Sequence, residues 1–190
     1  RPTCSLLAGK AMWMLGQYDA VGRYWSEEGM WQTLVARAPV VPKNEIDFQR
    51  FRQYYEVLRN IHPERPEAHF ALGTVSRSFG RWQESVDYFE QALLLSPYHP
   101  RYQCALGEAL VVTGRDVVRG VALCEEALRF APDDLWLYYQ AGVTLAKAGN
   151  CVRASAIFQA AREAFPSREE PGKWWEEYRQ GLIGKCASVN

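Results

Sequence analysis

The chain has 190 residues, of which 48% are hydrophobic and 23% are charged, a composition that can support a substantial core. Its 22 basic residues balance 22 acidic residues, which argues against nucleic acid as the main partner because phosphate-binding surfaces carry a basic excess. No apolar run approaches the roughly 18 residues that a membrane span requires, and the amino end lacks a signal-peptide pattern.

Residues 2–35 carry a weak pattern of two short helices. Glycine and aromatic residues mark it, at Gly9, Gly16, Tyr18 and Trp25. A further short helix over residues 29–38 is expected to break at the two prolines of the sequence APVVPK, because proline cannot continue a helix. We interpret this proline turn at residues 39–42 as a structural connection, and a binding feature is the alternative.

The next helix is predicted from Asn44 to about Ile61. Asn44 has the character of an N-cap, with Asp47 three residues later. Apolar residues then recur at helical spacing, at Ile46, Phe51, Tyr54, Tyr55, Leu58 and Ile61. This segment would be the second helix of an irregular pair over residues 36–65.

Residues 66–99 contain the clearest pattern, a hairpin of two amphipathic helices. The first helix has one apolar face, formed by Phe70, Leu72, Val75 and Phe79. Gly80 ends it. The second helix has its own stripe, formed by Trp82, Val86, Phe89, Leu93 and Leu95. Pro97 stops the pattern, so the segment is predicted to form a helix hairpin.

The same marks recur 34 or 35 residues further along, which indicates a repeat architecture. The recurring sets are Gly73, Gly107 and Gly142; Gly80, Gly114 and Gly149; Ala92, Ala127 and Ala161; Pro97, Pro132 and Pro166. They define three repeats over residues 66–99, 100–134 and 135–168. The small residues are expected where helices cross closely, with Phe89, Cys124 and Phe158 beside them. The one extra residue falls in the turn between Gly114 and Gly120.

Residues 169–190 are predicted to form a capping helix and tail. Trp174, Tyr178 and Leu182 are four residues apart, with Trp175 beside them, and charged residues occupy the other face. Such a helix covers the apolar face that the last repeat of a stacked array leaves bare. An exposed aromatic patch for a partner is the alternative interpretation of the two tryptophans.

The residues of the clearest hairpin give the chain a resemblance to a known family. Leu72, Gly73, Gly80, Trp82, Phe89, Ala92 and Pro97 occupy the positions of the signature residues of the tetratricopeptide repeat. The resemblance implies an all-α fold, a right-handed solenoid of stacked antiparallel helix hairpins over residues 1–168, capped by 169–190. Residues 2–35 then form a degenerate repeat, because Ala8, Val21 and Glu28 replace the family's usual residues.

The resemblance also implies a binding surface, since first helices in this family line a concave groove that holds a partner polypeptide. The partner-binding positions carried over are Phe70, Thr74, Arg77, Arg101, Cys104, Glu108, Val111, Trp136, Tyr139 and Val143, continued by Leu6, Lys10 and Trp13. Family members that clamp a chaperone carboxylate use lysine and asparagine where this chain has Phe70 and Thr74, which disfavours that subclass. Packing of Phe70, Trp136 or Tyr139 between repeats is the alternative.

The sequence contains few residues in an arrangement typical of catalysis or metal binding. Its histidines, His62, His69 and His99, have no carboxylate or cysteine at ligand spacing, so we expect no metal, no cofactor and no enzymatic activity. Its cysteines, Cys4, Cys104, Cys124, Cys151 and Cys186, are odd in number and in no CxxC spacing. We expect buried thiols and a reducing, cytoplasmic compartment, with a disulfide or a reactive thiol as alternatives.

Two functions stay open. The first is a non-catalytic protein–protein interaction scaffold, part of a larger assembly or secretion protein, that binds a polypeptide or forms a homo-oligomer. The second is a regulatory, substrate-positioning or dimerisation domain attached to an enzyme such as a transferase. Because the chain begins with Arg1 inside a repeat pattern, we expect an excised domain or a processed product. An RNA-processing role of the related half-repeat type is disfavoured by the neutral charge.

Overall fold

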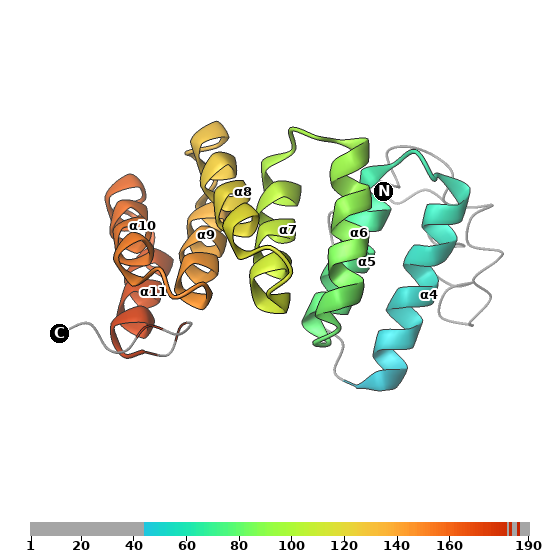
Figure 1. Cartoon of the computed structure of the whole chain (residues 1–190), viewed down its shortest axis with the longest axis horizontal. Coiled ribbons are helices and arrows are strands. Elements are labelled where there is room, and N and C mark those ends of the chain that lie inside the picture. Colours follow the sequence, from blue (N-terminus) through green and yellow to red (C-terminus); the bar gives the residue numbers. More distant parts are fainter. Residues whose placement is uncertain (1–43, 182, 184–185, 187–190) are drawn as a thin grey trace, which may run out of the picture. The chain divides into compact units, whose positions relative to one another are not determined.

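The computed structural model describes residues 44–181, 183 and 186, and within them every regular element is an α-helix (Figure 1). The chain divides into two compact units, residues 1–96 and 97–190, which we describe separately. The first contains α4 (Glu45–Ile61), α5 (Pro66–Ser78) and α6 (Trp82–Leu95). The second contains α7 (Pro100–Thr113), α8 (Val117–Phe130), α9 (Leu135–Lys147), α10 (Cys151–Ala164) and α11 (Glu170–Arg179). The expected repeat over 2–35 and the proline turn lie outside the described residues.

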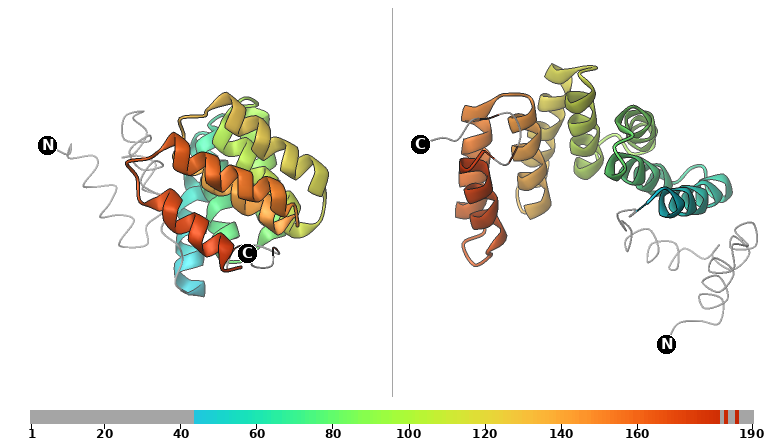
Figure 2. Two further views of the ribbon diagram at one scale, coloured as in Figure 1. Left: turned by 90° about the vertical axis from the view of Figure 1, so that its left-hand side faces the viewer. Right: turned by 90° about the horizontal axis from the view of Figure 1, so that it is seen from below.

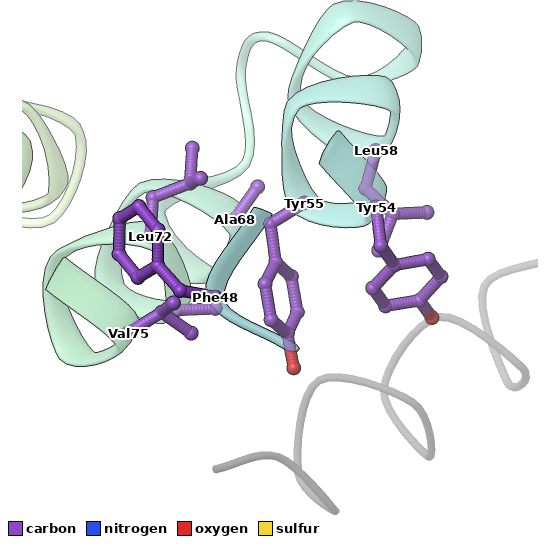
Figure 3. Close-up of a cluster of buried hydrophobic side chains, with 8 residues drawn as sticks. Phe48, Tyr54, Tyr55, Leu58, Ala68, Leu72 and Val75 are labelled. Carbon is purple, nitrogen blue, oxygen red and sulfur yellow. The ribbon is translucent and has the colours of Figure 1, made fainter. Parts of the chain in front are cut away.

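Helix α4 begins and ends where the sequence predicts. The Asn44 side chain accepts a hydrogen bond of 2.9 Å from the backbone N–H of Asp47, which satisfies one of the unpaired donors of the first turn. The buried face of α4 packs on α5, and Figure 3 shows Phe48, Leu72 and Val75 gathered between the two helices. This cluster is the core of the first unit.

The α5–α6 hairpin depends on one close approach between its helices. A Cβ atom added at Gly73 would lie 2.5 Å from Cε1 of Phe89, so the ring occupies the space that any side chain would need. Gly80 then turns the chain with a φ of 78°, a left-handed conformation that other residues adopt at a cost. The predicted close crossing is therefore present.

The two hairpins of the second unit repeat this geometry. A Cβ at Gly142 would lie 2.6 Å from Phe158, and a Cβ at Gly107 would lie 2.4 Å from the backbone oxygen of Gly120. In the α7–α8 hairpin, therefore, a second glycine replaces the aromatic ring and the two backbones come together. The extra residue of this repeat lies in the turn, where Asp116 caps α8 by accepting from the N–H of Arg119 at 2.9 Å.

Helix α9 is central to the second unit. It contacts α7, the first helix of the preceding hairpin, and it also packs against α8 and α10. Its Tyr139 ring lies 4.9 Å from the Trp174 ring of α11. The helices α7, α9 and α11 are thus linked through α9, and α7 and α9 carry the predicted binding positions of this unit.

The carboxyl-terminal segment folds back onto the last hairpin. Figure 2 shows α10 and α11 side by side, and the Tyr178 ring of α11 lies 5.2 Å from the Phe158 ring. The Tyr178 hydroxyl donates a hydrogen bond of 2.6 Å to the carbonyl oxygen of Cys151. Ile183 and Cys186 are buried in the same cluster. A protective role for this segment at the end of the array stays a prediction.

The cysteines correct the expectation of buried thiols. Cys104 and Cys124 form a disulfide between α7 and α8, and Cys151 and Cys186 form a second one between α10 and the carboxyl-terminal tail. Cys104 and Cys124 are both fully buried, although Cys104 had also been carried over as a partner-binding position. The sequence could not reveal the pairs because each joins residues that only the fold brings together. The cysteines therefore no longer indicate a reducing compartment.

Replacement of Ala92 by Leu is expected to destabilise the chain by about 1–3 kcal/mol, because Ala92 is fully buried and larger side chains overpack such a site. Urea unfolding followed by circular dichroism measures the change. The matched control is Leu94→Ala on the same helix, where Leu94 is 71% exposed and the effect should stay within about 0.5 kcal/mol. Equal unfolding midpoints for the two variants would refute the packing role of Ala92.

The disulfides predict that maleimide labels at most one of the five cysteines, Cys4, in denatured but unreduced protein. Intact-mass spectrometry before and after reduction counts the labels. Breaking either bond by a Cys→Ser substitution should lower the free energy of unfolding by about 2–4 kcal/mol, since a crosslink restricts the unfolded chain. Labelling of all five cysteines without reductant would contradict both bonds.

Candidate functional site

The predicted binding positions of the first unit are largely occupied by contacts within the unit. Phe70 packs against Phe89, with 5.6 Å between ring centroids. Thr74 is 6% exposed, and its hydroxyl donates to the carbonyl oxygen of Phe70. Arg77 is half-buried at the end of α5. Leu6, Lys10 and Trp13 lie outside the described residues.

The predicted positions of the second unit fall into a buried group and an accessible group. The buried group comprises Cys104, Glu108, Val111 and Val143. The side chain of Cys104 is fully buried and disulfide-bonded, so it cannot contact a partner. The accessible group comprises Arg101, which is exposed, and Trp136 and Tyr139, which are half-buried.

Glu108 forms an ion pair inside the unit. Its carboxylate lies 2.7 Å from Nζ of Lys147, which joins α7 to α9. The Glu108 side chain is 6% exposed and that of Lys147 is 32% exposed, so the ammonium group offsets much of the cost of burying the carboxylate. Glu108 therefore positions the two helices that carry the predicted binding positions.

An open hollow of about 670 Å³ lies at the beginning of α9 and α11, and we call it the α9–α11 hollow. Trp136 and Trp174 form its aromatic wall, and Ala131 and Leu135 complete the apolar lining. Its charged groups are Arg101, Asp133, Asp134, Arg168 and Glu170. Cavities of this size are typical of ligand sites.

The two arginines of the hollow are each paired with a carboxylate. Arg101 donates to both oxygens of Asp134, at 2.6 and 3.0 Å, and Arg168 donates to both oxygens of Glu170, at 3.1 and 2.6 Å. Hydrogen bonding to Arg168 lowers the pKa of Glu170 to about 2, and hydrogen bonding to Asp134 raises the pKa of Arg101. The Arg101 guanidinium and the Glu170 carboxylate are therefore charged at neutral pH.

Aromatic contacts fix the wall of the hollow. The Trp174 ring packs on Tyr139, and the guanidinium carbon of Arg101 lies 5.6 Å from the centroid of the Trp136 ring. Asp134 also accepts a hydrogen bond of 3.1 Å from the N–H of Trp136, which caps α9. The arrangement is a preformed surface with aromatic and charged groups.

The structure thus brings together Arg101 and Trp136 from the predicted set, and it adds residues that sequence reasoning did not assign to the site. These are Asp133, Asp134, Arg168, Glu170 and Trp174. One signal was available in the sequence. Asp134 is the N-cap residue of α9 and Trp136 lies in the first turn of that helix, while Trp174 lies within α11. The pairing of Arg168 with Glu170 depends on a turn whose geometry the spacing does not specify.

Within residues 44–181, 183 and 186, no group of three or more His, Cys, Asp or Glu side chains is arranged to hold a metal ion. Of the helices that the structure describes, none is long and apolar enough to cross a membrane. The hollow offers aromatic surface, hydrogen-bond donors and charged side chains, all of which can bind a ligand or a partner.

Residues 66–99, the hairpin α5–α6 with the following turn, match the model of the tetratricopeptide repeat family. This hairpin is a tetratricopeptide repeat, and the described part of the chain shares the fold of solved tetratricopeptide-repeat proteins. The predicted all-α solenoid class is confirmed by solved structures of the same fold. No curated protein is significantly similar to this chain in sequence.

Solved structures illustrate the likeness. YrrB, described as a tetratricopeptide-repeat protein with an unusual peptide-binding site, matches with a TM-score of 0.53 and 19% identity over 87% of this chain and 78% of its own. The domain of yeast Sti1 in complex with an Hsp90 peptide matches with a TM-score of 0.52 and 15% identity over 93% and 84% of the two chains. These identities show the fold alone.

An O-GlcNAc transferase of Thermobaculum terrenum also matches, with a TM-score of 0.56 and 18% identity. The match covers 87% of this chain but 28% of the transferase. This chain therefore corresponds to a minor part of that enzyme's length.

Replacement of Lys147 by Met should destabilise the protein by about 1–3 kcal/mol, because the buried Glu108 carboxylate loses its ammonium partner. Thermal and urea unfolding measure the effect. Lys173→Met is the matched control, since Lys173 is 69% exposed in its pair with Glu169 and should change stability by less than about 0.5 kcal/mol. If both lysine substitutions changed the free energy of unfolding by the same small amount, the positioning role of Glu108 would be refuted.

Proposed function

We propose that the chain is a non-catalytic interaction module that binds a segment of a partner polypeptide on the face formed by α7, α9 and α11. The α9–α11 hollow is the centre of this site. The observation that carries the proposal is the pair of half-buried tryptophans, Trp136 and Trp174, lining an open hollow of about 670 Å³. Buried aromatic anchors of this kind supply much of the affinity of protein interfaces.

The contacts beneath the hollow support a preformed site. Trp174 is held by Tyr139, and Trp136 begins a helix whose N-cap, Asp134, is itself held by Arg101. A partner would therefore meet ordered groups, which lowers the entropy cost of association. Peptide binding by YrrB and by the Sti1 domain shows that the shared fold accommodates this function in other proteins.

The disulfide-bonded cysteines also bear on the cellular compartment of the protein. Two disulfides in one unit favour an oxidising environment over the cytoplasm that the sequence suggested. A role within a larger assembly or secretion protein fits such a compartment.

The second candidate is a helper domain of an enzyme, and the observation that favours it is the match to the Thermobaculum transferase. In that case the same face would position a substrate polypeptide for a catalytic domain of the same protein. Both candidates require the hollow to bind a polypeptide. A neighbouring catalytic domain in the full-length protein would favour the helper role.

The test is a selection of peptides from a random library of linear twelve-residue sequences displayed on their messenger RNA, with the wild-type chain as bait. Individual peptides are then measured by fluorescence anisotropy against Trp136→Ala. Loss of an aromatic anchor should weaken binding by about tenfold or more. Circular dichroism and thermal melting confirm that the variant is folded.

Val152→Ala is the matched control, because Val152 is 83% exposed on α10 and does not line the hollow. It should bind the selected peptides as the wild type does. Failure to select any peptide, or peptides that bind Trp136→Ala with unchanged affinity, would overturn the proposed site.

A further inference from the structure

The charges that line the α9–α11 hollow do not balance. Two guanidinium groups face three carboxylates, so the lining carries a net charge of −1. Arg101 and Arg168 each hold one carboxylate through two hydrogen bonds. Asp133, the third acid, is exposed and forms no hydrogen bond or ion pair with any residue in the described part of the chain. The hollow therefore presents one uncompensated negative charge beside two indole rings.

The aromatic wall suits a cation. Tryptophan attracts guanidinium and ammonium groups to the face of its ring through the negative charge of the π-electrons. Arg101 already shows this preference, since its guanidinium carbon lies 5.6 Å from the Trp136 centroid. Trp174 lines the hollow from α11 and is anchored on Tyr139. A second cation entering the hollow would meet indole and the Asp133 carboxylate together.

An anionic group or a wholly apolar segment would fit the hollow less well than a cation. An anion would have to compete with Asp134 for Arg101, and Asp134 is fixed because it also caps α9 through the N–H of Trp136. A wholly apolar segment would desolvate the Asp133 carboxylate without giving it a partner, which is unfavourable. Charge complementarity thus selects a basic side chain.

We propose that the α9–α11 hollow recognises a polypeptide segment through a lysine or arginine side chain, whose cation lies against the tryptophan wall and is paired with Asp133. This inference rests on the proposed function and adds the chemistry of the partner. The hollow, at about 670 Å³, has room for the basic residue and its neighbours in an extended segment.

The test uses the peptides selected from the random twelve-residue library, sequenced for composition and measured individually at low and high salt. Lysine or arginine should be enriched at one position. Replacing that residue by acetyl-lysine or citrulline removes the charge while keeping most of the shape, and should weaken binding about fivefold or more. Asp133→Asn should weaken the basic peptides about two- to fivefold, the size expected of an exposed ion pair.

Glu177→Gln is the matched control. Glu177 is an exposed acid on α11 that does not line the hollow, so its removal changes the net charge equally and should leave affinity unchanged. The uncharged peptides should no longer distinguish Asp133→Asn from the wild type, because the two changes remove the same interaction.

The outcomes separate this inference from the proposed function. Peptides that depend on Trp136 but show no basic enrichment, and bind Asp133→Asn as they bind the wild type, would leave the proposed function standing and overturn the basic side chain. Selected acidic peptides would also overturn it. If no peptide is selected, both proposals fall.

Discussion

The close crossing of the two helices within each hairpin is the constraint on which the rest of the structure depends. At Gly73 and Gly142 an aromatic ring of the second helix fills the space where a Cβ would lie, and at Gly107 the backbone of Gly120 fills it. Only the absence of a side chain permits these distances. The crossing fixes how far each first helix lies from its second helix, and so which side chains remain accessible.

The accessible face of the second unit follows from that crossing and from the Glu108–Lys147 pair. Side chains of α7 that point into the unit are used for packing, as Cys104 and Val111 show. The ends of the first helices are different, since Arg101 and Trp136 lie where the turns leave room for a hollow. The candidate binding surface is thus at the beginning of these helices rather than along their length.

The sequence predicted the hairpins well because their determinants are local: glycines at positive φ, an N-cap at Asn44, and apolar residues at helical spacing. The site was predicted less completely. Cys104 belongs to the family's binding positions, but whether such a position is accessible depends on the partner helix, here through Cys124. Asp133 and Arg168 lie in turns, where spacing does not determine which groups converge, so the hollow became visible only in three dimensions.

The candidate binding site also depends on the carboxyl-terminal segment, which supplies part of the lining of the hollow. Glu170 and Trp174 belong to α11, which is held on α10 by Tyr178, through its ring contact with Phe158 and its hydrogen bond to Cys151. Cys151 is in turn bonded to Cys186 of the tail. Because the tail disulfide and the Tyr178 anchor meet at the same residue, order in the tail, the position of α11 and the shape of the tryptophan wall are physically linked. A segment expected only to cover an apolar end therefore supplies part of the candidate binding surface.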